Sequence, residues 1–251
     1  MVHLTGTLIN VGTVLAGTII GASLRDRLPE RIRETAMDGL GLITILVGLD
    51  SALSVSRPPL ATLVDGVAAG AVPVLVVLGS VLLGGIIGEL IRVEDGLAWA
   101  GDALKRRFAR GDRRFTEAFV VASLVFCVGP LTILGSIRDG LSGDYSLLAI
   151  KAMLDGFAAL AFASVLGWGV GFSIITILVY QGGLSLAASA VAGAIPDPAS
   201  SPAIAAITAT GGVLILAIGL RLLRLREVRV GNLLPALALA PVAVLVIEQL
   251  S

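Results

Sequence analysis

Long apolar runs separated by short polar stretches fill almost the whole chain. A transmembrane helix needs about 20 consecutive, mostly apolar residues. We expect all the runs to belong to a single membrane domain, residues 1–251. The pattern predicts an all-α, polytopic transmembrane helical bundle with apolar runs at Leu4–Leu24, Ala36–Leu53, Leu60–Ile91, Phe115–Ile137, Leu147–Leu166, Gly169–Ala194, Ala203–Leu223 and Leu233–Leu250.

The third run, Leu60–Ile91, does not fit one ordinary crossing. Its 32 residues are many for one membrane span and few for two. Pro58 and Pro59 precede the run, and Pro73 interrupts it. Proline disrupts a helix because it lacks the backbone N–H and its ring clashes with the preceding turn. We therefore predict a broken helix or a short re-entrant hairpin here, and eight or nine crossings in all.

A unit of about three apolar segments recurs along the chain. Residues 11–21 align without a gap to residues 78–88, and three glycines coincide. Residues 63–69 align to residues 153–159 around a shared Asp-Gly pair. An odd number of crossings per unit would invert consecutive copies, an arrangement that many transporters use. The correspondences predict repeat units at about 1–72, 73–166 and 167–251, with the last copy degenerate.

Composition excludes several classes of protein. Hydrophobic residues make up 56% of the chain and charged residues 14%, whereas soluble domains carry about 25% charged residues. The 18 basic residues balance the 18 acidic ones, so we expect no nucleic-acid partner. Cys127 is the only cysteine and His3 the only histidine, which excludes an intramolecular disulfide, a metal site of several cysteines and an HExxH or histidine-cluster site, and leaves a Ser-His-Asp triad without support. We expect no enzyme activity, no cofactor and no bound metal.

Basic residues gather in three short polar stretches. Four lie in Arg25–Arg33, seven in Arg92–Arg114 and four in Arg221–Arg229, which together hold 15 of the 18. Lys and Arg that flank membrane helices are retained in the cytoplasm. We predict that the second and third stretches are cytoplasmic and that the C-terminus lies outside.

The side of the N-terminus depends on the third run. If Leu60–Ile91 crosses once, the chain has eight crossings, its N-terminus is outside and Arg25–Glu34 is inside. If the run crosses twice, there are nine crossings, the N-terminus is cytoplasmic and Arg25–Glu34 is outside. The repeat favours nine crossings, whereas the distribution of charge mildly favours eight.

The polar stretch after the third run has a pattern of its own. Val93, Leu97, Leu104 and Phe108 recur among charged residues at near-helical spacing. This spacing predicts an amphipathic helix that lies in the membrane interface. The alternative is a solvated connector between two spans.

Carboxylates inside the apolar runs are the strongest functional candidates. An ionised carboxylate at the centre of a membrane helix costs about 2.5 to 3.5 kcal/mol on insertion scales. Asp155 lies roughly 12 Å into its run at about 1.5 Å per residue, and Asp65 holds the equivalent repeat position. Paired acids at matching places in two repeats are typical of an ion or substrate site. Lys151 is one helical turn before Asp155, so a structural ion pair is an equally open interpretation.

Other polar residues extend the set of pathway candidates. Asn10 lies in the first run, Ser136 near the kink expected from Pro130, and Gln181 in a Tyr-Gln-Gly-Gly sequence. Each could instead hydrogen-bond a neighbouring helix. Asp50 is either a pathway acid or the end of a helix near the external surface.

Two further acids, Asp139 and Asp144, flank the external loop predicted after Ser136. They could select cations at an entrance to the pathway. The favoured interpretation is that both are solvated loop acids, because a carboxylate in a polar loop keeps its hydration.

Residues 122–144 carry a resemblance to a known family. This block resembles domain-of-unknown-function family 554, the YqgA/YdfK-like integral membrane proteins of bacteria, and residues 6–10, 151–156 and 180–183 agree with it. The resemblance covers essentially the full length, although Pro130 departs from the small residue expected there. It implies a protein of the bacterial cytoplasmic (inner) membrane that is often regarded as a transporter. It carries over no substrate and no site residue.

These observations converge on a membrane carrier. We predict a secondary transporter or channel-like carrier for a small solute or ion, embedded in the lipid bilayer as a homo-oligomer. We expect Asp65, Asp155 and Lys151 near its pathway. The alternative function is a non-transporting membrane scaffold or assembly partner.

Overall fold

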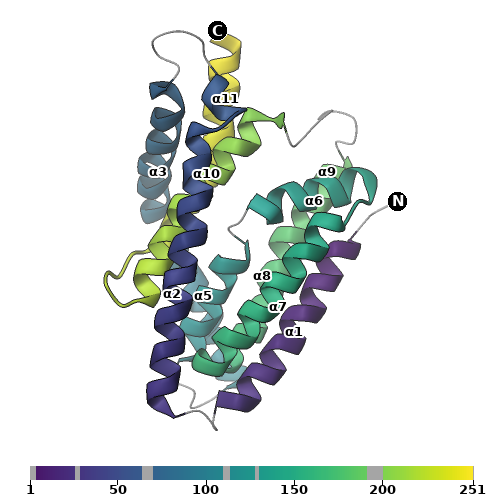
Figure 1. The fold of residues 1–251 in the computed structure, drawn as a ribbon, viewed down its shortest axis with the longest axis vertical. Helices are drawn as coiled ribbons and strands as arrows, with labels where there is room; N and C mark the ends of the chain where they lie inside the picture. Colours follow the sequence, from purple (N-terminus) through teal and green to yellow (C-terminus); the bar gives the residue numbers. More distant parts are fainter. Residues whose placement is uncertain are drawn as a thin grey trace. The chain divides into compact units, whose positions relative to one another are not determined.

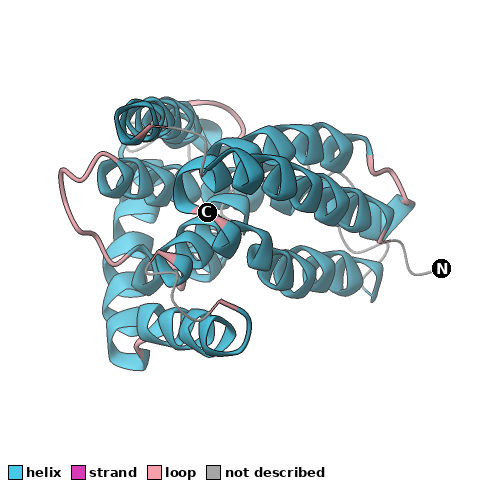
Figure 2. Cartoon of the chain, turned by 90° about the horizontal axis from the view of Figure 1, so that it is seen from below, coloured by secondary structure: helices cyan, strands magenta, loops and turns pink. Residues whose placement is uncertain are grey.

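The computed structural model describes residues 4–25, 29–63, 70–109, 114–127, 130–190 and 200–250. Every regular element among these residues is a helix, so the predicted all-α bundle is confirmed (Figure 2). The longer helices are α1 (Thr5–Arg25), α2 (Glu30–Ala52), α3 (Ala71–Ile91), α4 (Val93–Phe108), α5 (Phe115–Cys127), α6 (Pro130–Ser142), α7 (Ser146–Leu166), α9 (Gly183–Ala190), α10 (Pro202–Leu222) and α11 (Ala236–Leu250). Shorter helical turns are η1 (Leu53–Ser56), η2 (Leu60–Thr62), η3 (Trp168–Ser173), α8 (Ile174–Ile177), the π-helical η4 (Leu178–Gly182) and η6 (Val230–Leu233).

Contacts group the chain into two compact units, each built from two separate stretches of sequence. Unit 1 contains Met1–Leu42 and Gly96–Pro196, and unit 2 contains Ile43–Asp95 and Asp197–Ser251. Each unit therefore joins an early part of the chain to a late one. Figure 1 labels most of the α-helices of both units.

In unit 1, α1 and α7 pack side by side along most of their length (Figure 1). A Cβ atom on Gly17 would overlap the carbonyl oxygen of Gly156, and one on Gly21 would overlap the carbonyl oxygen of Leu160. Small residues let helix backbones approach closely in lipid, where no hydrophobic drive exists between helices. Residue numbers rise together along the two helices, so α1 and α7 run parallel.

Two spans of unit 1 are irregular. α5 and α6 form a bent pair with an angle of 61° between them. Pro130 is the first residue of α6, where its missing N–H leaves no helical hydrogen bond unmade. The predicted kink near Pro130 is thus confirmed. The span Trp168–Ser189 passes through a 3-10 turn, a short α-helix and the π-helical turn Leu178–Gly182.

The irregular span Trp168–Ser189 lies against α5. A Cβ atom on Gly169 would overlap the carbonyl oxygen of Phe115. Further along both segments, the hydroxyls of Ser123 and Thr176 share a hydrogen bond of 2.9 Å. The order of these contacts shows that α5 and this span run parallel.

Unit 2 packs α3 against α11. Gly84 lies against Ala236, and a Cβ atom on Gly88 would overlap the carbonyl oxygen of Asn232. Residue numbers fall along α11 as they rise along α3, so these helices are antiparallel. They share a core with η2 and α10, which contains Leu60, Val76, Ala206, Ala209, Ala240 and Val244.

The C-terminal part of α2 packs against α10 in the same unit. Gly48 lies against Leu216, and a Cβ atom on Gly212 would overlap the backbone nitrogen of Ala52. The opposed order of these contacts makes α2 and α10 antiparallel as well.

Seven helices among the described residues are long and apolar enough to cross a membrane, or eight if the bent pair α5–α6 is one span. The run Leu60–Ile91 supplies one of them, α3. The run is divided, as predicted, but ahead of α3 and not at Pro73, which is the third residue of that helix. A proline in the first turn removes no helical hydrogen bond. Nine crossings would require two spans in this run. The described residues of the run contain only one, α3.

The amphipathic helix predicted after the third run is present as α4. Arg92, with a left-handed backbone at φ 57°, forms the corner between α3 and α4. Acidic residues occupy the first turn of α4 and basic residues the last, which complements the helix dipole. Trp99 is 70% exposed and Phe108 59% exposed. The position of α4 in the membrane interface stays a prediction.

Candidate functional site

An ion pair lies inside α7 of unit 1. Lys151 and Asp155 are one turn apart and so lie on the same face of the helix, and Lys151 Nζ donates to Asp155 Oδ2. Their side chains are only 6% and 13% exposed, and α7 is one of the candidate membrane spans. Removing charges from water costs several kcal/mol per ion, which a close partner offsets only in part. The two charges are therefore held in the protein interior at an energetic disadvantage.

Two carboxamides connect this ion pair to other helices. Asn10 Nδ2 of α1 donates to Asp155 Oδ2 at 3.0 Å and to Gln181 Oε1 at 3.0 Å. Gln181 Nε2 in turn donates to Thr7 Oγ1 at 3.2 Å. Thr7, Asn10 and Gln181 are buried. We call Thr7, Asn10, Lys151, Asp155 and Gln181 the polar network.

One acceptor of the polar network has no hydrogen-bond partner among the described residues. It is Asn10 Oδ1, in a side chain that is 0% exposed. A buried carbonyl oxygen without a partner costs about 1 to 3 kcal/mol. Such a group in a native structure calls for an explanation such as a water, an ion or a functional role.

An unusual backbone turn positions Gln181 in the network. Gln181 lies in the π-helical turn Leu178–Gly182. π-Helical turns are rare, and they occur frequently at functional sites. On the other side, Thr7 and Asn10 are three residues apart and so share one face of α1.

The break between α5 and α6 lies near the network. Cys127, the last residue of α5, is buried, and both α5 and α6 pack against α7, the helix that carries Lys151 and Asp155. Thr132 Oγ1 of α6 donates to the carbonyl oxygen of Phe126 at 3.2 Å, which satisfies one of the carbonyl groups that a helix end leaves free. Discontinuous membrane helices of this kind form the ion and substrate sites of many transporters.

The structure brings four of the seven predicted candidates together. Asn10, Lys151, Asp155 and Gln181 meet in the polar network. Ser136 of α6 is fully buried, and its Oγ has no hydrogen-bond partner among the described residues.

The remaining two candidates give no evidence for a pathway. Asp50 is exposed and forms a 3.0 Å ion pair with Arg57, in which the two side chains are 72% and 57% exposed. This geometry agrees with the end of a helix at a surface. Asp65 lies outside the described residues.

Asp139 is a functional candidate that sequence reasoning misjudged. Helix α6 extends to Ser142, so Asp139 belongs to a helix and not to a loop. It is 0% exposed, and its Oδ2 accepts a hydrogen bond of 3.2 Å from the backbone N–H of Gly6. The interpretation of Asp139 as a solvated acid is wrong, because the N-terminal turn of α1 covers it. Asp144 is 43% exposed, as a loop acid should be.

In the described part of unit 2, a cluster of charged residues lies at the end of its helices. Glu94, the second residue of α4, accepts from Arg221 Nη1 and from the backbone N–H of Gly231, both at 2.6 Å. Glu89 near the end of α3 accepts from Asn232 Nδ2 at 2.6 Å and pairs with Arg229. These bonds tie the α3–α4 corner to the loop between α10 and α11. The cluster holds a helix corner in place and reaches water, since Arg229 is 69% exposed.

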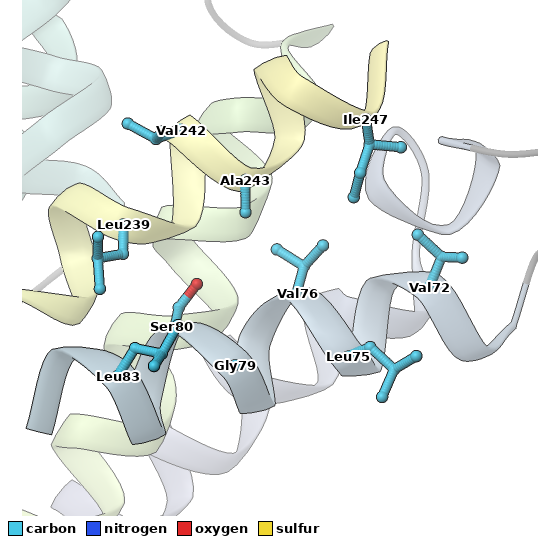
Figure 3. Close-up of a pocket in the computed structure, with 10 residues that line it drawn as sticks. All are labelled: Val72, Leu75, Val76, Gly79, Ser80, Leu83, Leu239, Val242, Ala243 and Ile247. Atoms are coloured by element: carbon cyan, nitrogen blue, oxygen red, sulfur yellow. The ribbon is translucent and has the colours of Figure 1, made fainter. Parts of the chain in front are cut away.

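A pocket of about 490 Å³ lies between α3 and α11 of unit 2. Its lining is apolar except for Ser80, as Figure 3 shows: Val72, Leu75, Val76, Gly79, Ser80, Leu83, Leu239, Val242, Ala243 and Ile247. Such a lining offers no charged or hydrogen-bonding group beyond one hydroxyl. The described residues also contain no group of three or more His, Cys, Asp or Glu side chains that could hold a metal ion.

Comparison with known proteins identifies the family. The chain is 30% identical over 243 residues to an uncharacterized membrane protein of Bacillus subtilis, YdfK, covering 97% of this chain and 96% of that protein. It is 34% identical over 241 residues to an uncharacterized protein of Escherichia coli, YqgA, covering 94% of each chain. No solved structure matches it. The family described as proteins of unknown function 554 (DUF554) matches residues 5–245, and the chain therefore belongs to the DUF554 family of membrane proteins.

Proposed function

We propose that this protein is a secondary transporter or channel-like carrier for a small solute or ion in the bacterial cytoplasmic membrane, and not an enzyme. The observation that carries the proposal is the buried Lys151–Asp155 ion pair, joined to Asn10 of α1 and to Gln181 of a π-helical turn. Ionisable side chains inside membrane spans are rare and mark ion pathways and proton relays.

Stability alone is a poor explanation for the ion pair. Replacing a buried ion pair with apolar residues of similar volume is often neutral or stabilising by about 1 to 4 kcal/mol. A helix that only had to pack would gain nothing from Lys151 and Asp155. Their surroundings also match a binding site, because Asn10 joins Asp155 to a π-helical turn and the bent pair α5–α6 packs against α7.

The direction of helix packing in unit 1 favours eight crossings. If every span crosses once, two spans are parallel only when an odd number of spans lies between them. Counting α5–α6 as one crossing leaves three spans between α1 and α7, which agrees with their parallel contact. Nine crossings would leave four spans between α1 and α7, and a re-entrant α5–α6 would leave two. Both alternatives would make α1 and α7 antiparallel.

The helix pairs of unit 2 favour the same count independently. Four spans lie between α3 and α11, and four lie between α2 and α10, when the chain crosses eight times. Both pairs should then be antiparallel, and both are. With seven crossings, α3 and α11 would be parallel. With nine, α2 and α10 would be parallel.

Eight crossings also place the positive charges consistently. The stretches Arg25–Arg33, Arg92–Arg114 and Arg221–Arg229, which hold 15 of the 18 basic residues, then share one side of the membrane. By the positive-inside rule this side is the cytoplasm. The N-terminus and the C-terminus are both outside in this proposal.

Labelling of single cysteines tests this topology. In a Cys127→Ser background, intact cells carrying Arg57→Cys should react with a membrane-impermeant maleimide. Cells carrying Asp26→Cys should react only after the membrane is opened. Nine crossings would reverse both results, so labelling of Asp26→Cys in intact cells would sink the eight-crossing topology.

Flux through liposomes tests the proposed transport. The purified chain is reconstituted, and currents are recorded on solid-supported membranes after jumps of Na⁺, K⁺, Cl⁻, acetate and alanine, with an entrapped pH dye reporting protons. For a species that the parent moves, Asp155→Asn and Lys151→Met should each lower the current at least tenfold. The reason is that each removes one charge of the buried pair and leaves the packing nearly unchanged.

Asp50→Asn provides the matched control, because it changes an exposed acid at the end of α2. It should keep the parent's current. Parent-like currents in both Asp155→Asn and Lys151→Met would contradict the proposal. A parent chain that moves no species of the panel would favour the second candidate, a non-transporting scaffold. One observation favours a scaffold: Trp99 and Phe108 of α4 are exposed and could contact a partner protein.

A further inference from the structure

We propose that the polar network is a binding site for a monovalent cation, and that the Lys151 ammonium is the built-in competitor of that cation. The inference rests on the proposed function and names its class of ion. It starts from the oxygen atoms that surround Asn10.

Three side-chain oxygens can converge at one point of the network. Asp155 Oδ2 and Gln181 Oε1 each lie 3.0 Å from Asn10 Nδ2, while Asn10 Oδ1 is buried without a described partner. A half-turn of the Asn10 carboxamide exchanges its oxygen and nitrogen. Asn10 Oδ1 then faces Asp155 Oδ2 and Gln181 Oε1, and a cation among these three acceptor oxygens would satisfy all of them at once.

The donor set suits a hard cation with a single charge. Carboxylate and amide oxygens are the ligands that hard cations such as Na⁺ prefer over nitrogen or sulfur. The network contains one carboxylate, that of Asp155. One negative charge balances one monovalent ion, whereas Ca²⁺ sites gather several carboxylates and six to eight oxygen ligands.

Lys151 already occupies the carboxylate of this site. Its ammonium donates to Asp155 Oδ2, the same oxygen that Asn10 Nδ2 contacts. The ion pair is neutral as it stands, so a second cation at Asp155 would be repelled by the ammonium at short range. A lysine carries its charge at the tip of a flexible four-carbon stem. Lys151 can therefore swing away when a cation binds Asp155 and return when the cation leaves.

Such competition gives a simple carrier cycle. The network is charge-neutral when Lys151 pairs with Asp155, and Asp155 remains neutralised when the cation replaces Lys151. The displaced ammonium then needs a second partner, a solvated position or the loss of its proton. In each case cation binding is coupled to a movement of Lys151.

Thermal unfolding of the full-length protein in detergent tests the site directly. Parent and Lys151→Met are compared in NaCl, KCl, LiCl and choline chloride at equal ionic strength and one pH. Because a ligand that binds the folded state raises its stability with concentration, at least one alkali cation should stabilise Lys151→Met over choline in a saturable way. The apparent affinity should be at least tenfold tighter than in the parent, where Lys151 competes.

Three further variants separate the site from general effects of salt. Lys105→Met removes the chain's only other lysine, on α4, and should behave as the parent does. Lys151→Met/Asp155→Asn should lose the cation effect. Lys151→Gln should show the tighter cation response even if Lys151→Met folds poorly.

Two results would overturn the inference. One is the absence of any difference between alkali cations and choline in both Lys151 variants, and the other is an equal shift with and without Asp155. The flux assay keeps this failure distinct from that of the proposed function. Asp155-dependent flux without cation binding rejects the cation alone, whereas parent-like flux in both Asp155→Asn and Lys151→Met rejects transport through the network.

Discussion

Two helix contacts, α1 with α7 in unit 1 and α3 with α11 in unit 2, are both close approaches of helix backbones at glycine residues. Their side chains differ. Gly17 and Gly21 bring α1 onto α7, and Gly84 and Gly88, each 67 residues later, bring α3 onto α11. At a matching third position, a Cβ atom on Gly12 or on Gly79 would meet no other group within 4 Å. This agreement is what the predicted repeat requires, and the repeat itself stays a prediction.

Side chains at a few positions make the two contacts chemically different. Thr7 and Asn10 of α1 correspond to Val74 and Val77 of α3 at the same offset. The α1 contact holds a buried ion pair and two carboxamides, whereas the α3 contact opens into an apolar pocket (Figure 3). A close helix contact therefore provides a frame, and the polar residues placed on it decide whether it can bind a charged species.

The two units also differ in the depth of their charges. Lys151 and Asp155 lie within a membrane span and are almost fully buried, whereas Arg229 and Glu89 pair at a helix end with 69% and 56% exposure. Water screens the second pair and leaves it worth about 0 to 1 kcal/mol. Disrupting the buried pair should therefore change the stability of the protein more than disrupting the exposed pair.

The largest expected effect follows from this difference in burial. Lys151→Met leaves the Asp155 carboxylate buried without its counter-ion, which should lower the free energy of unfolding by about 3 to 5 kcal/mol in choline chloride. Arg229→Met, the matched change in unit 2, should lower it by less than about 1 kcal/mol. Denaturant unfolding of both variants in the same detergent measures the two values.

A double change sharpens the same comparison. Lys151→Met/Asp155→Leu replaces the ion pair with apolar side chains, so it should restore the parent's stability or exceed it, although it should abolish transport. Equal losses in Lys151→Met and Arg229→Met would show that the buried pair is as well solvated as the exposed one. The contrast between the units would then be lost.

The glycine contacts give the next largest effect. Gly17→Ala and Gly84→Ala both drive a methyl group into a neighbouring backbone, which should cost about 1 to 3 kcal/mol in either unit. Gly12→Ala and Gly79→Ala occupy the open positions and should gain up to about 1 kcal/mol from helix propensity. Thermal unfolding of the four variants separates packing from propensity. A neutral Gly17→Ala beside a harmful Gly84→Ala would break the equivalence of the two contacts.

The architecture could be predicted well from the sequence because the local composition of a segment largely determines whether it forms a membrane helix. Apolar runs of the right length predicted the bundle, and near-helical spacing predicted α4. Pro130 predicted the bend between α5 and α6, since a proline excludes a continuous helix wherever its ring clashes. Each of these features depends on residues close together in the chain.

The candidate site was predicted as a list of residues and not as a network. Asn10, Lys151, Asp155 and Gln181 were candidates because polar groups are rare in apolar runs. Their meeting depends on hydrogen bonds between residues 145 and 171 positions apart, which no local pattern encodes. The burial of Asp139 was not predicted for the same reason, because the residue that covers it, Gly6, lies 133 positions away in the chain.

The smallest effect concerns how the helices of the two units begin. In unit 1, Asp144 Oδ1 accepts from the hydroxyl and the backbone N–H of Ser146, at 2.6 and 3.1 Å, at the start of α7. These hydrogen bonds, with Arg138 nearby, lower the pKa of the Asp144 carboxyl below its ordinary value of 3.8. In unit 2, Ser201 precedes α10 without a side-chain cap hydrogen bond.

A lowered pKa in the folded state means that ionised Asp144 stabilises the fold at every pH above the ordinary carboxyl pKa. This stabilisation is lost as the pH falls through the lowered value. Asp144→Asn keeps an acceptor oxygen but not the charge, so its melting temperature should lie slightly below the parent's at pH 7, and the difference should narrow at pH 3, below the ordinary carboxyl pKa. Ser201→Ala should match the parent at both values. A gap for Asp144→Asn that stays constant with pH would show that the hydrogen bonds, and not the charge, hold the start of α7.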